Sequence, residues 1–190
     1  MKIFSPALSR LARFRYWHIE HWVNNPIAAQ REVLQDLITH GQYTQFGRKY
    51  QFANIFNIRT FKQTVPIHEY HDMKPYIDQV MEGEDSILWN TPVKWFAKSS
   101  GTTSDKSKFI PLTEESIQDN HFQGSKDVLA LYYKAMPDSD LLTGKGLIIG
   151  GSHQVHPIKE DIQYGDLSAV LLQNSPFWAG LIRTPELSIA

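Results

Sequence analysis

The sequence predicts an α/β protein in which a helical N-terminal part precedes a mixed part of strands and helices. Two observations carry this prediction. Apolar residues recur at helical spacing up to about residue 85, whereas short apolar runs typical of strands flank a small polar loop after it. We therefore assign residues 1–85 to a mainly helical portion and residues 86–190 to a mixed α/β portion.

Two long helices are expected at the front of the chain. Ser5-Pro6 supplies a cap and a first-turn proline for the first of them. Basic residues among apolar ones at this end also match a transit peptide, but the pattern continues through Trp22 without a cleavage-like break. We therefore expect an amphipathic helix. Asn25-Pro26 predicts the start of the second helix, and Gly41 predicts its end.

Shorter elements complete the helical part. Residues 43–57 are typical of an ordered loop with short turns. Thr60 and Gln63 predict a capping box ahead of a short helix. Pro75 predicts the start of a further helix, which ends at Gly83.

Strands and helices alternate in the second part. The runs typical of strands are residues 87–89, 93–97, 109–112 and 146–151, the last of them buried. Thr113 predicts a helix cap followed by two glutamates that complement the helix dipole, and this helix stops before Met136-Pro137. Two more helices are expected from Asp166 onward, separated by Pro176.

Composition restricts the classes of function. The 19 basic and 20 acidic residues leave a net charge of -1, so no global field attracts nucleic acid or an anionic membrane. No apolar run is long enough to cross a bilayer. Cysteine is absent, which excludes disulfides, thiolate metal sites and a cysteine nucleophile. We expect no nucleic-acid or membrane partner and a cytoplasmic location.

The motif that carries chemistry lies between two predicted strands. It is Ser99-Ser100-Gly101-Thr102-Thr103, closed by Lys108. Hydroxyls and turn N–H groups can converge on phosphate oxygens, a lysine adds charge, and a glycine lets the backbone approach. The same composition also suits a solvated hairpin loop. The spacing matches neither a Walker loop nor a Gly-x-Gly-x-x-Gly fingerprint, which disfavours P-loop kinases and GTPases.

The histidines could bind a metal ion and the tryptophans could have a functional role, but each group also has a simpler structural explanation. The histidine groups are His18 with His21, His153 with His156, and His68 with His71 and Asp72. Zinc needs further ligands at defined spacing and none is evident, so no metal site is expected; the third group is expected to be exposed. The tryptophans are most simply core or domain-interface residues. Residues 150–154 suit either a pocket lining or a strand-exit turn.

The loop resembles the first signature of the adenylate-forming superfamily, Ser/Thr-Ser-Gly-Thr-Thr/Ser followed by a lysine. Preceding passages resemble the Gretchen Hagen family of auxin-responsive acyl-acid amido synthetases: Thr44-Gln45-Phe46-Gly47, Phe61 through Val65-Pro66-Ile67 to Tyr70, and Lys74-Pro75-Tyr76-Ile77 into Gly83-Glu84. With Lys108-Phe109-Ile110-Pro111 they occur in the family's order over most of residues 30–115. Beyond Thr113 the chain is more similar to bacterial-type members than to plant-type ones.

One departure from the plant-type pattern affects the loop. Plant-type members have two glycines where this chain has Ser104 and Asp105. A carboxylate beside a polyphosphate is electrostatically unfavourable, so we expect Asp105 to point to solvent.

The resemblance implies that residues 1–190 are an incomplete N-terminal domain of an adenylate-forming, luciferase-like enzyme. Family members use ATP to activate a carboxylic acid as an acyl-adenylate and then join it to an amino acid. By this resemblance Ser99, Ser100, Gly101, Thr102 and Thr103 hold the β- and γ-phosphates, Lys108 balances their charge, and Mg²⁺ bridges phosphate oxygens. A small carboxylic acid and an amino acid are the implied substrates, and no catalytic side chain is assigned. The alternative is a non-catalytic fragment that only binds nucleotide or protein.

Overall fold

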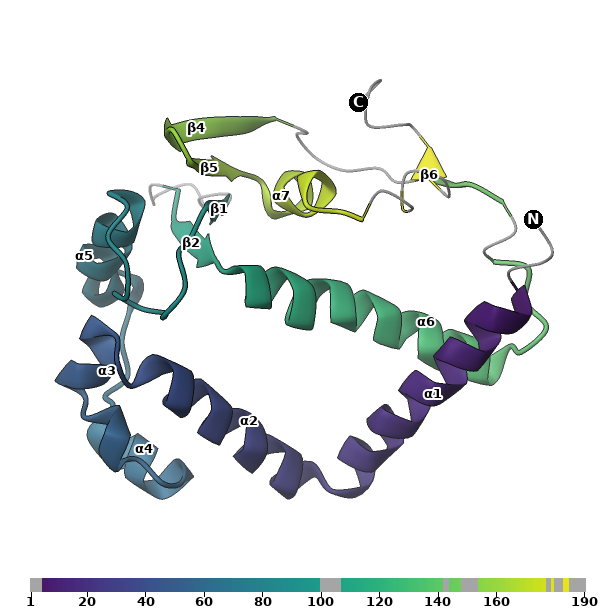
Figure 1. The fold of residues 1–190 in the computed structure, drawn as a ribbon, viewed down its shortest axis with the longest axis horizontal. Coiled ribbons are helices and arrows are strands. Elements are labelled where there is room, and N and C mark those ends of the chain that lie inside the picture. The colour runs from purple at the N-terminus through teal and green to yellow at the C-terminus, as the bar shows by residue number, and fades with distance from the viewer. Residues whose placement is uncertain are drawn as a thin grey trace.

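A computed structural model describes residues 5–99, 107–141, 144–147, 154–176, 179 and 183–184, and it has the expected mixed α/β character. The helical part comprises α1 (Ser5–Asn24), α2 (Pro26–Gly41), α3 (Gln45–Lys49), the 3₁₀ turn η1 (Phe52–Asn54), α4 (Ile58–Thr64) and α5 (Tyr70–Met81). The later elements are β1 (Trp95–Lys98), β2 (Phe109–Leu112), the π-helical turn η2 (Ser116–Phe122), α6 (Gln123–Ala135), β3 (Gly146–Leu147), β4 (Val155–Lys159), β5 (Ile162–Gly165), α7 (Leu167–Gln173) and β6 (Arg183–Thr184). Figure 1 shows α1, α2 and α6 extending to one side of the sheet.

The main sheet has the strand order β2-β1-β5-β4. Strands β1 and β2 form an antiparallel hairpin with Lys98 opposite Phe109, whereas β1 runs parallel to β5 with Ala97 opposite Gly165. Strand β4 pairs antiparallel with β5 at the sheet edge, where Pro157 is tolerated because one side of an edge strand needs no donor. The carboxyl ends of β1 and β5 therefore lie at the same edge of the sheet.

Both faces of β1 are covered. Phe96 packs with Tyr76, Ile77 and Val80 of α5 and with Ile162 of β5. The next residue, Ala97, belongs to a second cluster with Leu112, Ile117 of η2 and Val170 of α7. Successive strand residues point to opposite faces, so α5 covers one face of the sheet and α7 with η2 covers the other. This fixes the hairpin to a packed core on both sides.

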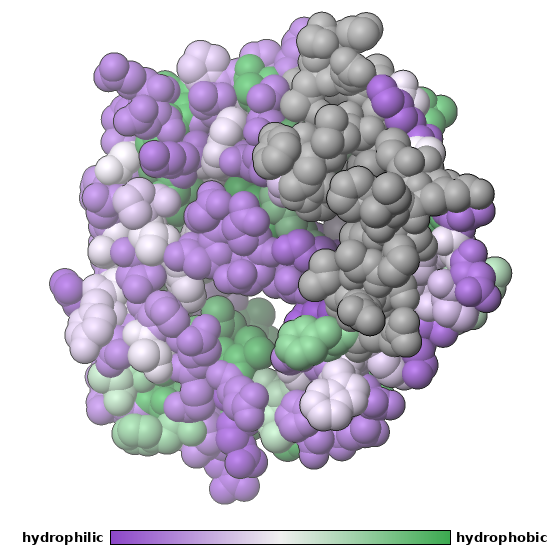
Figure 2. All heavy atoms as spheres, turned by 45° about the vertical axis from the view of Figure 1, so that its right-hand side comes forward, coloured by the Kyte–Doolittle hydropathy of each residue, from purple (hydrophilic) through white to green (hydrophobic). Residues whose placement is uncertain are grey.

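Helix α1 is attached to the rest of the chain mainly through α6, which it crosses in Figure 1. Its partner on α6 is Asp127, which forms an ion pair with Arg15. The tryptophans were expected in the core or at a domain interface. Trp17 and Trp22 do not lie in the core, since they are 73% and 41% exposed, and a domain interface stays a prediction for them. Figure 2 shows apolar side chains among the exposed atoms of one face.

Capping explains most differences from the predicted helix boundaries. Helix α4 begins after Asn57, whose side-chain oxygen accepts from the Thr60 N–H, so the expected Thr60–Gln63 capping box is wrong. Pro75 lies inside α5 and does not begin it, because the Glu69 N–H donates to the Asp72 carboxylate and starts the helix earlier. Gly83, at φ +87, ends α5 as expected, in a backbone conformation that glycine adopts without strain.

Residues 87–89 do not form the expected strand. The carbonyls of Ser86 and Ile87 accept from the N–H groups of Gln45 and Phe46 at the first turn of α3. The segment therefore satisfies a helix terminus and pairs with none of the strands that the structure describes. The loop expected over residues 43–57 likewise contains α3, because the Thr44 hydroxyl accepts from the Gly47 N–H as an N-cap.

The second part is confirmed in outline. Thr113 caps the helical stretch through a bond from the Ser116 N–H, and the helix ends before Met136 as expected, with η2 as an unexpected π-helical turn. Of the strand expected at residues 146–151, only Gly146–Leu147 is described, and these residues are exposed, not buried. Helix α7 confirms the first of the two late helices, and the second falls largely outside the described residues. Nowhere in the described ranges is a helix long and apolar enough to cross a membrane.

Candidate functional site

The two ends of the predicted phosphate loop are held together by β1 and β2. The Ser99 N–H donates to the Lys108 carbonyl at 2.9 Å, and the Lys108 N–H donates to the Ser99 hydroxyl oxygen at 3.2 Å. Of the six residues predicted to bind phosphate, the structure therefore brings Ser99 and Lys108 into contact. The other four, Ser100, Gly101, Thr102 and Thr103, lie outside the described residues, as do Ser104 and Asp105.

Two lysines flank the mouth of this loop. The Lys108 ammonium lies 5.5 Å from the ring centre of Tyr70, and the Lys98 ammonium lies 5.9 Å from that of Tyr164. Both distances are within the range in which an aromatic face attracts a cation. Lys98 is the last residue of β1 and Lys108 directly precedes β2, and lysine ammonium and serine hydroxyl groups are donors that suit a phosphate anion. Lys98 was not among the predicted residues, although its place directly before Ser99 was visible in the sequence.

A tyrosine hydroxyl fastens the hairpin to α5. The Tyr70 oxygen accepts from the Phe109 N–H at 2.9 Å and donates to the Phe109 carbonyl at 3.3 Å. The Phe109 ring in turn packs edge-on against Tyr164, with ring centres 5.2 Å apart. No local pattern predicts a role for Tyr70, because a contact between residues 39 positions apart leaves no spacing signal.

Residues 150–154, which suit either a pocket lining or a strand-exit turn, lead into β4 at the same edge of the sheet. Gln154 precedes β4, and a Cβ added to Gly165 at the end of β5 would lie 2.9 Å from the Gln154 carbonyl oxygen. Residues 150–153 are outside the described part of the chain, so the choice between the two interpretations stays open. Gly165 pairs with Ala97 of the strand that leads into Ser99, and Gln154 lies on the far side of Gly165 from that strand.

A second polar cluster lies on α3 and α5. The Lys49 ammonium donates to the Tyr76 hydroxyl at 2.7 Å, and this hydrogen bond raises the pKa of Lys49 above its ordinary value. The Tyr50 hydroxyl is 2.7 Å from Nε2 of His68, whose ring packs against Phe46. His68 is thus half-buried and hydrogen-bonded, so the expectation that it is exposed is wrong. His71 is exposed as expected.

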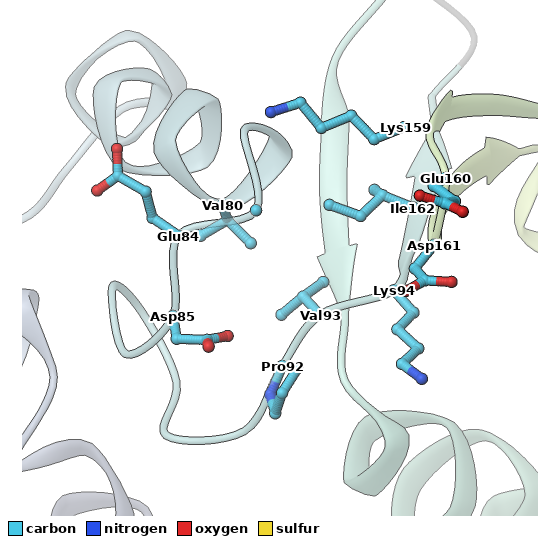
Figure 3. A pocket seen from close by; sticks show the side chains of 11 residues that line it. Val80, Glu84, Asp85, Pro92, Val93, Lys94, Lys159, Glu160, Asp161 and Ile162 are labelled. Carbon is cyan, nitrogen blue, oxygen red and sulfur yellow. The ribbon is translucent and has the colours of Figure 1, made fainter.

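A pocket of about 280 Å³ opens at the opposite edge of the sheet (Figure 3). It lies between the end of α5, the segment that enters β1 and the β4–β5 turn, with Asp85, Lys94 and Asp161 among its lining residues. Lys159 is engaged by the carboxylate of Glu82 at 2.8 Å. This pocket faces the amino ends of β1 and β5, away from the loop. Across the residues that the structure describes, histidine, aspartate and glutamate side chains nowhere gather in a group of three that would hold a metal ion.

Comparison with known proteins gives one family. Residues 15–189 match the family model described as the GH3 family N-terminal domain. The chain is 31% identical over 135 residues to the indole-3-acetic acid-amido synthetase GH3.2 of Arabidopsis thaliana, covering 68% of this chain and 23% of that protein. It is 28% identical over 149 residues to the jasmonoyl-L-amino acid synthetase JAR6 of Nicotiana attenuata, covering 78% and 25%.

The fold has solved counterparts. The AtGH3.15 acyl acid amido synthetase, in a structure with 2,4-DB, superposes with a TM-score of 0.74 at 24% identity, over 86% of this chain and 28% of that one. A second structure, of the GH3.15 acyl acid amido synthetase, gives 0.70 at 24% identity, over 83% and 29% of the two chains. The mixed α/β fold is therefore that of part of these enzymes. The chain spans about a quarter of the length of the relatives it matches.

Proposed function

Since the chain belongs to the GH3 family, we propose that it supplies the phosphate-binding hairpin of an acid–amino acid ligase that uses ATP. The observation that carries the proposal is the closed loop mouth, where Ser99 and Lys108 bond to each other at the carboxyl end of β1. Ligands of α/β folds bind at this edge of the sheet. The proposed phosphate ligands are Ser99, Ser100, Gly101, Thr102, Thr103 and Lys108.

In the proposed reaction, a carboxylate oxygen attacks the α-phosphorus of ATP and pyrophosphate leaves. The amine of an amino acid then attacks the acyl carbon, giving an amide and AMP. The task of this chain is to hold and orient the β- and γ-phosphates by hydroxyl, backbone and lysine donors. Bound Mg²⁺ would neutralise part of the phosphate charge. A small carboxylic acid, an amino acid and a cytoplasmic site of action remain predictions, as does the bacterial type.

We further propose that the chain binds Mg-ATP without completing the reaction. Support comes from its coverage of only about a quarter of GH3 relatives. Groups that bind the acid and the amine would then lie in the remaining part of such enzymes. Carboxylate-dependent exchange of pyrophosphate into ATP by the 190-residue chain alone would contradict this second proposal.

Calorimetric titration with Mg-ATP tests the phosphate site directly. Replacing Lys108→Ala should weaken binding by about tenfold or more, because a charge-assisted hydrogen bond is removed. Lys62→Ala on α4 is the matched control, since it removes the same charge from an exposed position of another element. Equal affinity of both variants and the wild type would refute the assignment of Lys108.

A non-catalytic protein-binding module is the second candidate function. The observation that favours it is an apolar groove of about 590 Å³ along α1 and α2, lined by Trp22, Val33 and Leu37 among others. Such an exposed apolar surface is more typical of an interaction site than of a solvated helix face. The same titration separates the two functions, because a module of this kind has no affinity for Mg-ATP.

A further inference from the structure

We infer that Tyr70 is a positioning residue for the phosphate-binding hairpin: its hydroxyl holds β2 where the chain leaves the loop, and so keeps Lys108 in place. The inference rests on the proposed function for the identity of the ligand. It adds a role for a residue on α5, a helix outside the loop itself. The contacts of Lys108 and Phe109 support it.

Consecutive residues at the loop exit are held from opposite sides. Lys108 uses both its backbone groups toward β1, accepting from the Ser99 N–H and donating to the Ser99 hydroxyl. In an antiparallel pair the next residue turns its N–H and carbonyl to the other side. Because β2 is the edge strand of the sheet among the described residues, none of the described strands faces those two groups of Phe109. The Tyr70 hydroxyl bonds to both of them and takes the place of a neighbouring strand.

The hydroxyl is itself fixed by the core. Tyr70 begins α5, and the same helix buries Tyr76, Ile77 and Val80 against the sheet. The bond from the Glu69 N–H to the Asp72 carboxylate, 2.9 Å long, stabilises the first turn of α5, where Tyr70 lies. The part-buried hydrogen bond from the Phe109 N–H to the Tyr70 hydroxyl therefore links the backbone of Phe109 to a helix that packs on the sheet.

The Tyr70 ring contributes separately from its hydroxyl. The ring centre lies 5.5 Å from the Lys108 ammonium, so the aromatic face attracts the cation that is proposed to face the phosphates. Replacing Tyr70→Phe retains this ring and removes only the two hydrogen bonds. The variant thus isolates the attachment of β2 from the packing of Lys108.

The test compares Tyr70→Phe with Tyr50→Phe in the full 190-residue chain. Tyr50 is a matched control because its part-buried hydroxyl bonds to His68 and not to the hairpin. In Tyr70→Phe, the Phe109 amide should exchange hydrogen about fivefold faster or more, because its acceptor is gone. The Kd values for Mg-ATP and for inorganic pyrophosphate should both rise about three- to tenfold, because fewer molecules hold the loop exit in the binding geometry.

A merely structural role for Tyr70 predicts a different pattern. Both variants would then lower the unfolding midpoint, while the Kd measured well below that midpoint would stay at the wild-type value. Wild-type affinity in Tyr70→Phe, or unchanged exchange at Phe109, overturns the inference. If the wild-type chain binds neither ligand, the proposed function fails, and the exchange of the Phe109 amide still decides whether Tyr70 holds the strand.

Discussion

Breaking the ion pair between Arg15 and Asp127 should weaken the attachment of α1 to α6 without abolishing it. The Arg15 guanidinium donates through Nε to one carboxylate oxygen at 2.5 Å and through Nη2 to the other at 2.9 Å. The two side chains are 22% and 23% exposed, and Gln123 donates a further bond to the carboxylate at 3.0 Å. The ion pair is one part of the broad packing of α1 on α6, in which the Lys134 ammonium also lies 4.6 Å from the ring centre of Tyr16.

The size of the effect follows from this geometry. Fully exposed ion pairs contribute about 0.2–1 kcal/mol, whereas hydrogen bonds to charged groups reach about 1.5–3 kcal/mol. A two-pronged pair with about a fifth of each side chain exposed lies between these limits, so we expect a coupling energy of about 1–2 kcal/mol. Arg15→Lys should lose most of it, because lysine cannot make two parallel bonds to a carboxylate.

The coupling also depends on pH in a defined direction. The bonds from Arg15 hold the pKa of Asp127 below its ordinary value of 3.8, with a smaller contribution from Gln123, while burial opposes the shift. A carboxyl group whose pKa is lower in the folded state contributes its full stabilisation above the pKa of the unfolded state. That contribution is lost as the pH falls below 3.8 and through the folded-state pKa.

A double-mutant cycle in urea measures the coupling. Free energies of unfolding are compared for the wild type, Arg15→Ala, Asp127→Ala and the double variant at about pH 7 and about pH 3. The coupling should be about 1–2 kcal/mol at the higher pH and clearly smaller at the lower one. A coupling below about 0.3 kcal/mol at neutral pH, or one that grows on acidification, would refute the reasoning.

Three further predictions concern single positions. Gly47→Ala should destabilise the chain by about 2 kcal/mol or more, because the alanine Cβ would lie 2.0 Å from the Gly41 carbonyl oxygen. This cost exceeds the gain from the better helix propensity of alanine. Urea unfolding that shows a stability at or above that of the wild type would contradict this prediction. Thr44→Val should cost about 1–2 kcal/mol because the N-cap of α3 is lost, whereas Thr44→Ser should retain most of the stability in the same assay. Gly83→Ala should lower stability by about 1–2 kcal/mol, because its φ of +87 strains any side chain, and a neutral result would show that the turn after α5 can relax.

The sequence determined those features that depend on local pattern. Helical periodicity and glycine or proline punctuation located α1, α2 and the end of α5, and apolar runs on either side of a hydroxyl-rich loop located β1 and β2. The family could also be predicted from the sequence, because short motifs that occur in the family's order can be recognised without a structure. The match of residues 15–189 to the family model confirms it. The contact between Ser99 and Lys108 was also accessible, since both residues belong to one contiguous motif, and their binding of phosphate stays a prediction.

Long-range contacts decided the remainder. Residues 87–89 have the composition of a strand, yet the carbonyls of Ser86 and Ile87 accept from the first turn of α3, and no local sequence pattern predicts this contact. Strands β4 and β5 went unpredicted because Pro157 interrupts the alternation of β4, and because both strands depend on long-range pairing, β5 with β1 and β4 with β5.

The attachment of the loop to α5 is also decided by a long-range contact. Tyr70 reaches Phe109 across 39 positions because α5 and the hairpin pack on a common core. A motif can therefore name residues that are proposed to bind a phosphate, while the backbone position of Phe109 beside that motif depends on a side chain elsewhere in the chain. Hydrogen bonds at a sheet edge are satisfied by whatever the fold brings near, and that depends on three-dimensional packing and not on sequence spacing.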